Sequence, residues 1–209
     1  MSTVAAIRIG PADNGRSMTL EEFMEAEVEE GFRYELARGV IEVTKVPRDA
    51  HRQVVTNLYD MISQYRRTHR GVVLSYGGGS EFQLWLPGMV SGRNPDLGVV
   101  LHGTPKDRNG RRNPVLVAEV VSEESIHRDY ETKREEYLRH GILEYWIVDP
   151  LKRQVTILTR DGDVWRESIL RDQQTIDSMI LPGLGTIVSE LWADVEEDEP
   201  ADLNDDSGN

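Results

Sequence analysis

The segment PVLVAEVV, residues 114–121, decides the fold because nearly every position in it is apolar. A strand with one face in water alternates polar and apolar residues, whereas a strand covered on both faces is apolar throughout. We therefore predict a strand at the centre of a sheet. A helix over residues 129–140, ended by Gly141, and a second buried strand over residues 144–148 should follow it. This order predicts parallel pairing through a right-handed crossover, and so an α/β fold.

The sequence on either side contains signals for two more helices and several strands. Thr19 and Glu22 have the spacing of a capping box, which predicts a short helix that ends near residues 29–31. The apolar residues after Pro47 recur with a helical period, so we expect a long amphipathic helix that stops before Gly71. Further strands are expected over residues 32–36, 40–44, 72–75, 81–86, 97–101, 155–158 and 164–170, with a polar loop over residues 102–113.

Length and composition predict one soluble domain. The chain has 209 residues, of which 38% are hydrophobic, so it is long enough to bury a core. It contains no cysteine, which excludes disulfides and cysteine-bound metals, and no apolar run of the roughly 20 residues that cross a bilayer. We expect a cytoplasmic protein with a flexible leader at residues 1–17, one domain at residues 18–192 and an acidic, disordered tail at residues 193–209.

The net charge of −13 is concentrated at the C-terminus, where residues 190–209 hold nine acidic side chains and no Lys or Arg. Two segments, residues 48–70 and residues 93–113, each have five basic and two acidic residues. They are candidates for contact with a polyanion such as nucleic acid. The alternative is that both are ordinary solvated surfaces.

Glu119 is the most informative polar residue because it lies inside the apolar segment. A buried carboxylate without a partner costs several kcal/mol, so its presence there requires a reason. Asp96, which follows Pro95 at the start of a predicted strand, could supply that reason by forming a cation site with Glu119. Mg²⁺ binds one or two carboxylates and keeps water and phosphate oxygens at its other positions. A structural salt bridge, or a strand end that reaches water, remains the alternative for Glu119.

Lys133 is the third candidate. It shares one stripe of the predicted helix with Tyr130, Tyr137 and Leu138, and this stripe should face the sheet. An exposed lysine normally avoids such a stripe. The alternatives are that its long stem carries the amine out to water, or that the amine pairs with a nearby acid such as Glu136.

Four stretches in order resemble the Uma-type family, whose members are regarded as restriction endonucleases within the PD-(D/E)XK nuclease superfamily. The resemblance runs from about Met18 to Leu191. It implies a restriction-endonuclease-like core, with a mixed central sheet flanked by helices and with N-terminal and C-terminal β-hairpins. The stretches are MTLEEFMEAEVEEGFRYELARGVIEV at 18–43, RNPDLGVV at 93–100, PVLVAEVVSEES at 114–125 and RDYETKREEYLRHGILEYWIVDP at 128–150.

The resemblance also implies an activity and a set of roles. It implies hydrolysis of DNA phosphodiester bonds with Mg²⁺ or Mn²⁺, and a homodimer. Asp96 and Glu119 would be the metal ligands, and Lys133 and Glu35 would join them at the catalytic centre. The residues in supporting or substrate-binding positions would be His51, Tyr137 and Arg128.

Two departures from the superfamily pattern keep a second function open. The superfamily lysine lies two residues after the second acid, where this chain has Val121, so Lys133 would have to replace it from the next helix. Glu123 and Glu124 also add negative charge near a site meant for phosphate. The alternative is therefore an inactive nuclease-fold protein that binds nucleic acid or a protein partner. His51 could be only a helix cap, and Glu35 could be only an ion-pair partner of Arg33 or Arg38.

Overall fold

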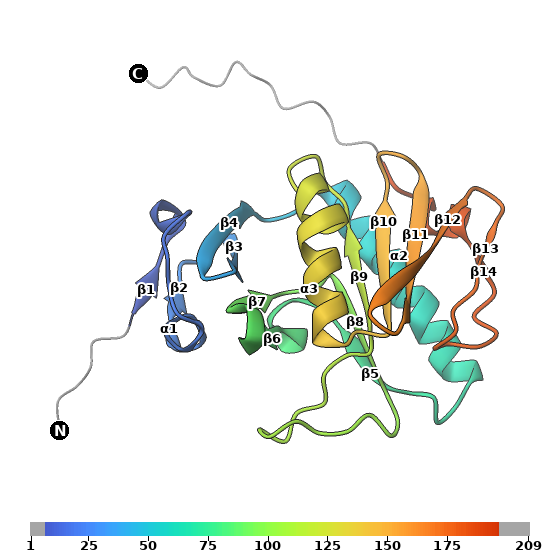
Figure 1. Ribbon diagram of the computed structural model, residues 1–209. Coiled ribbons are helices and arrows are strands. Elements are labelled where there is room, and N and C mark those ends of the chain that lie inside the picture. Colours follow the sequence, from blue (N-terminus) through green and yellow to red (C-terminus); the bar gives the residue numbers. More distant parts are fainter. Residues whose placement is uncertain (1–6, 197–209) are drawn as a thin grey trace, which may run out of the picture.

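The computed structural model describes residues 7–196 of the chain. Its centre is a six-stranded mixed sheet between two helices (Figure 1). Helix α2 (Asp49–Thr68) packs on one face, and helix α3 (Lys133–His140) packs on the other. In sheet order the strands are β12 (Val164–Arg171), β11 (Gln154–Asp161), β10 (Glu144–Asp149), β9 (Leu116–Val120), β8 (Leu97–Leu101) and β5 (Val73–Gly77).

Strand β9 lies inside this sheet, as its apolar sequence predicted. It pairs in parallel with β10 and antiparallel with β8. Leu116, Ala118 and Val120 belong to the core under α2, whereas Val117 belongs to the core under α3. Glu119 is the next residue on the α3 face because side chains alternate along a strand. The crossover between β9 and β10 therefore delivers α3 directly above Glu119.

Helix α2 forms because one stripe of its surface is apolar. Val54, Leu58 and Ile62 on this stripe are completely buried against the sheet. Each such side chain contributes about 1.5–3 kcal/mol when it leaves water. The predicted start after Pro47 and end before Gly71 are both confirmed.

The N-terminal segment is more ordered than the sequence indicated. Helix α1 (Leu20–Glu25) begins with the predicted capping box, in which Thr19 Oγ accepts from the Glu22 amide at 3.2 Å. The helix ends at Glu25, earlier than predicted, because β2 (Glu27–Val28) pairs with β1 (Arg8–Ile9). The prediction of a flexible leader is therefore wrong for residues 8–17, which include the buried Ile9.

A second sheet of four strands, in the order β4-β3-β7-β6, lies beside the main one (Figure 1). The predicted hairpin is confirmed, and its turn residues Arg38 and Gly39 both have positive φ, as a tight hairpin turn requires. The strand expected over residues 81–86 shrinks to β6, because residues 79–82 form a 3₁₀ helix. Strand β7 was not predicted. The bounds are β3 (Phe32–Ala37), β4 (Val40–Lys45), β6 (Leu84–Leu86) and β7 (Ser91–Arg93).

The C-terminal part adds the predicted hairpin β11–β12 and a cover for the α2 side of the sheet. This cover consists of β13 (Thr175–Ile176), β14 (Thr186–Ile187) and a 3₁₀ helix (Val188–Trp192). The expected acidic tail begins within the described residues, but its residues 197–209 lie outside them. None of the described helices combines the length and the apolar character that a membrane span needs. Two further 3₁₀ turns are Pro11–Asp13 and Pro87–Met89.

Candidate active site

Asp96 and Glu119 lie next to each other on neighbouring strands. The pairing of Leu97 with Ala118 continues by one step to place Asp96 opposite Glu119. Residues directly opposite in an antiparallel pair point to the same face. Both side chains are almost fully buried, at 4% and 3% exposure, and the Val120 amide donates to Asp96 Oδ2 at 2.9 Å. Glu119 therefore lies on the face covered by α3, and Asp96 lies beside it at the start of β8.

Basic groups on two other elements hold the Asp96 carboxylate. Arg33 Nη1 on β3 lies 2.9 Å from Oδ1, and His51 Nε2 on α2 lies 3.2 Å from Oδ2. Burial alone would raise the pKa of Asp96, but His51 and Arg33 hold it well below its usual range. The carboxylate is therefore ionised at neutral pH. Nδ1 of His51 is buried without a hydrogen-bond partner in the described part of the chain.

The backbone at Asp96 is fixed by a close approach of the glycine loop after β5. The Tyr59 hydroxyl donates to the Asp96 carbonyl at 3.0 Å, and the Gly79 amide donates to the Pro95 carbonyl at 2.9 Å. A Cβ atom on Gly78 would overlap both the Asp96 carbonyl and the Tyr59 hydroxyl. A larger side chain at position 78 would not fit, so this position requires glycine.

We expect Gly78→Ala to lower the free energy of unfolding by about 1–3 kcal/mol, the usual cost of overpacking. Urea denaturation followed by tryptophan fluorescence measures this loss. Gly88→Ala is the matched control, because a Cβ there meets no atom within 4 Å. Equal stability of the two variants would show that the loop moves away from Asp96 at little cost.

The Glu119 carboxylate is held from α3. Lys133 Nζ lies 3.0 Å from its Oε2, and the Tyr137 hydroxyl donates to its Oε1 at 2.6 Å. Burial nevertheless raises the pKa of Glu119 to about 8, because Lys133 only partly offsets it. The neighbouring Asp96 contributes to this rise. The positive charge near Glu119 is therefore too small to keep its carboxylate fully ionised at neutral pH.

Lys133 lies among three carboxylates. Besides Glu119, its Nζ is 3.5 Å from Glu35 Oε2 and 3.5 Å from Asp129 Oδ1. Burial would lower the pKa of this amine, but Glu119 and Glu35 raise it above the usual value, so the amine stays charged. The stem does not carry the amine to water, and Glu136 is not its partner. A π-helical turn, Arg128–Thr132, precedes Lys133 and helps to place Asp129 beside it.

Glu35 enters the same cluster from β3. Its Oε2 lies 3.2 Å from Arg93 Nη1, and the Asn94 amide donates to its Oε1 at 2.8 Å. Against the effect of burial, Lys133 and Arg93 lower the pKa of Glu35 to about 2. The alternative partners considered for Glu35, Arg33 and Arg38, do not pair with it in the described structure.

The completely buried Arg93 joins the four-stranded sheet to α3. Its Nε lies 2.7 Å from Glu136 Oε2, and its Nη1 lies 2.7 Å from Glu42 Oε2. Ser91 also donates to Glu136, at 2.9 Å. Arg93 was counted in a basic segment that could face a polyanion, and this prediction is wrong for Arg93 because its charge is used inside the protein.

Arg128 is the remaining predicted residue, and it lies at the edge of the cluster. Its Nε is 4.0 Å from Asp129 Oδ1, and this nitrogen is buried without a hydrogen-bond partner among the described residues. The sequence analysis missed Arg33, Arg93, Asp129 and Glu136. Only Asp129 had a usable signal, because it precedes Lys133 by four residues on the same helical face.

The cluster has an excess of negative charge. With every side chain ionised, its six acids and four permanent cations leave two uncompensated negative charges. Burial is the largest cause of the raised pKa of Glu119, and the neighbouring acids Asp96, Asp129 and Glu35 add to it despite the contact with Lys133. The acids are Glu35, Glu42, Asp96, Glu119, Asp129 and Glu136, and the cations are Arg33, Arg93, Arg128 and Lys133.

Comparisons with known proteins agree with this fold. A crystal structure of "a putative nuclease belonging to DUF820 from Anabaena variabilis" superposes with a TM-score of 0.67 and 17% sequence identity, over 84% of this chain and 97% of that one. This likeness confirms the restriction-endonuclease-like core that the sequence predicted. No curated protein matches the chain. The model of the family Uma2, described as "Putative restriction endonuclease", matches residues 20–191, and the chain therefore belongs to this family.

Proposed function

We propose that the protein is an endonuclease that hydrolyses DNA phosphodiester bonds with Mg²⁺, or Mn²⁺, held by Asp96 and Glu119. One observation carries the proposal. Two buried acids lie at adjacent positions where the register of β8 and β9 is continued by one residue, and a charged amine lies 3.0 Å from one of them. Two acids and a lysine in this relation are the elements that metal-assisted phosphodiester hydrolysis requires.

The chemistry of the site supports a divalent cation. Carboxylate oxygens are the ligands that Mg²⁺ prefers, and it commonly takes only one or two of them from the protein. The two uncompensated negative charges of the cluster match the charge of one such ion, and an added cation would favour the ionised form of Glu119. No group of three or more His, Asp or Glu ligands is arranged for a metal within residues 7–196. Water and phosphate oxygens would complete the coordination.

When bound, the metal would supply Lewis acidity, which lowers the pKa of a water molecule and stabilises charge on the phosphoryl oxygens. In the hydrolysis, the water oxygen forms a bond to phosphorus as the bond to one ester oxygen breaks. That ester oxygen leaves with a proton, so one strand end carries a phosphate and the other a hydroxyl.

The residues of the chain have distinct parts in this reaction. Lys133 would orient the water or contact a phosphoryl oxygen as a cation, because its raised pKa prevents it from acting as a base at neutral pH. Tyr137 fixes the orientation of Glu119, and His51 fixes that of Asp96. The guanidinium of Arg128, whose side chain is partly exposed at the edge of the cluster, is suited to hold a phosphate beside the site.

The test is cleavage of supercoiled plasmid DNA by the purified protein. We expect nicked and linear products with Mg²⁺ or Mn²⁺ and none with EDTA. Asp96→Asn and Glu119→Gln should each reduce the rate by on the order of 10³-fold, since each weakens the binding of the metal that would stabilise the anionic transition state. The control is Glu124→Gln, which changes an exposed carboxylate outside the cluster. Cleavage that survives both substitutions would refute the assigned centre, and DNA retardation without cleavage by any variant would favour the inactive binding protein.

A further inference from the structure

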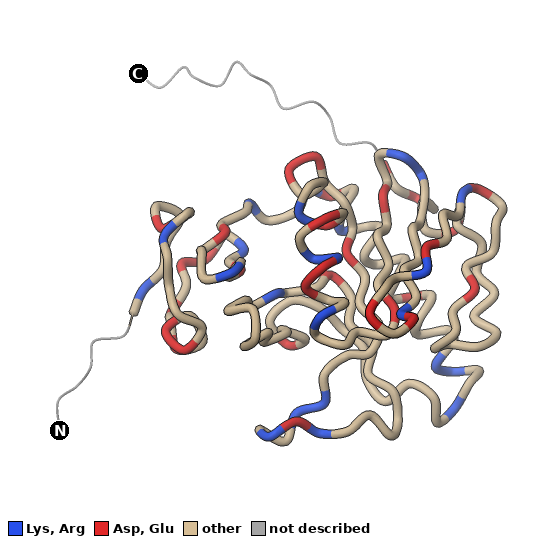
Figure 2. Tube along the Cα trace, viewed as in Figure 1, with Lys and Arg blue, Asp and Glu red and all other residues tan. Residues whose placement is uncertain are grey.

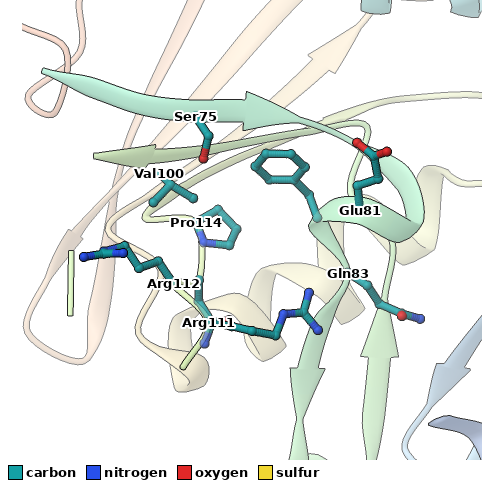
Figure 3. A pocket seen from close by; sticks show the side chains of 9 residues that line it. Ser75, Glu81, Gln83, Val100, Arg111, Arg112 and Pro114 are labelled. Atoms are coloured by element: carbon teal, nitrogen blue, oxygen red, sulfur yellow. The ribbon is translucent and has the colours of Figure 1, made fainter. Parts of the chain in front are cut away.

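A small pocket opens on the main sheet beyond the candidate active site (Figure 3). Its volume is about 210 Å³, and its lining includes three apolar side chains, Phe82, Val100 and Pro114. Arg111 and Arg112 line it from the loop before β9. We call it the Phe82 pocket. Pockets for drug-sized ligands are usually about 300–1,000 Å³, so this one suits a single small ring.

The Phe82 ring packs against two glycines on neighbouring strands. Gly77 on β5 and Gly98 on β8 pair directly across the two strands. A Cβ on either glycine would come within 2.5 Å or 3.0 Å of the Phe82 ring. The missing side chains of this glycine pair therefore let the ring lie against the backbone of both strands. Phe82 is only partly buried, so part of its surface is open to a ligand.

The loop beside the pocket carries positive charges that form no ion pair with an acidic side chain of residues 7–196. Lys106, Arg108, Arg111 and Arg112 make no ion pair within residues 7–196, and Figure 2 shows their segment as a largely basic protruding loop. The acid in this loop, Asp107, is used otherwise, because its Oδ1 accepts from the Asn109 and Arg111 amides at 2.9 Å each. Arg112 Nε donates to the Thr104 carbonyl at 2.8 Å, but this contact leaves the positive charge of the guanidinium available to an anionic ligand.

The Phe82 pocket lies on the same face of the sheet as the candidate active site. Along β8, Leu97 and Val99 belong to the core under α2, so Asp96 and Val100 lie on the opposite face. These two residues are four positions apart, which is roughly 13 Å along an extended strand. A nucleic-acid strand bound at Asp96 therefore reaches the pocket within a few nucleotides.

We propose that the Phe82 pocket binds one unstacked nucleotide of a single-stranded segment, with its base against the Phe82 ring and its phosphates on Arg111 and Arg112. Bases stack on aromatic side chains regardless of sequence, and arginines contact the backbone. Gln83 and Glu81, which also line the pocket, offer acceptors for the N–H groups of a base edge. The inference rests on the proposed function for its class of ligand, and it specifies unpaired DNA near the cut.

The test measures binding without cleavage, in EDTA, by fluorescence anisotropy of a labelled thymidine 12-mer. We expect the native protein to bind this strand roughly fivefold or more tightly than an abasic strand of equal length. Phe82→Leu should remove most of that difference, and Phe82→Tyr should preserve it. Replacing Arg111 and Arg112 together by alanine should lower the slope of log affinity against log salt by about 1.4, or about 0.7 per lost phosphate contact.

The matched control replaces Arg8 and Arg166 by alanine, which removes the same charge from two exposed side chains outside both basic segments. Equal losses from the two double variants would overturn the proposal, because binding would then be general electrostatic attraction. Equal binding of the thymidine and abasic strands by the native protein would also overturn it. The comparison of the thymidine and abasic DNA strands uses only the native protein. It therefore tests the proposal even if Phe82→Leu folds poorly. Because EDTA stops metal-dependent cleavage, the outcome is independent of whether the plasmid assay supports hydrolysis.

Discussion

Lys133→Met should reduce plasmid cleavage by on the order of 10³-fold and also make the protein less stable. Both effects have one cause, because the Lys133 amine is the cation shared by Glu119, Glu35 and Asp129. Without it, three buried carboxylates lose a partner. Leaving a buried charge unpaired typically costs about 3–5 kcal/mol. Methionine keeps an unbranched apolar side chain that is only one heavy atom shorter, so the lost charge dominates the result.

The double variant Lys133→Met with Glu119→Gln separates the catalytic role from the structural one. Removing both partners of a buried ion pair is often close to neutral, so we expect the part of the loss that is due to Glu119 to return, while Glu35 and Asp129 still lack the amine. Cleavage should not return, because the chemistry needs both groups. Urea denaturation and the plasmid assay measure the two properties. Activity in the double variant equal to that of the native protein would reduce the pair to a structural salt bridge.

The sequence contained enough information to predict the central unit of the fold. Residues 114–121 are apolar because β9 is covered by α2 on one face and α3 on the other. Such burial on both faces leaves a continuous apolar pattern that can be recognised without coordinates. Glu119 could be selected for the same reason, since one acid among apolar residues stands out. Its partner Asp96 was predicted less directly, because Pro-Asp occurs in many turns.

Other parts of the site could not be predicted, since they depend on contacts between distant segments. Arg93 belongs to β7, a strand of three residues that is too short to show a period. Nothing local shows that its guanidinium is buried among carboxylates from β3, β4 and α3. Arg33 is similar, because its contact with Asp96 spans 63 residues. Local patterns show which side chains are unusual, whereas the topology decides which of them meet.

The second large expected effect concerns Arg93. We expect Arg93→Met to lower the free energy of unfolding by about 3–5 kcal/mol at pH 7, because Glu35, Glu42 and Glu136 would lose their shared cation. Glu42→Gln is the control. It removes one partly exposed acid and leaves Arg93 with two others, so its cost should stay near 1 kcal/mol or less.

The pH dependence of the free energy of unfolding shows whether Arg93→Met destabilises the protein by removing charge or by disturbing packing. The folded-state pKa of Glu35 is lowered to about 2 from an ordinary value of 4.5. An acid with a lowered pKa stabilises the folded state fully above its unfolded pKa, and this contribution is lost as the pH falls through the folded value. The native protein therefore loses stability between about pH 5 and pH 2.

In Arg93→Met, the buried acids can accept protons at higher pH than in the native protein, since one of their cations is gone. The stability difference between the native protein and the variant should therefore be largest above pH 5 and should shrink as the pH falls. Urea denaturation at pH 7 and pH 4, followed by tryptophan fluorescence, to which the buried Trp146 contributes, measures this difference. A difference of the same size at both pH values would mean that the guanidinium stabilises the packing of the four-stranded sheet on α3 by filling space, and that the pKa of Glu35 does not depend on Arg93.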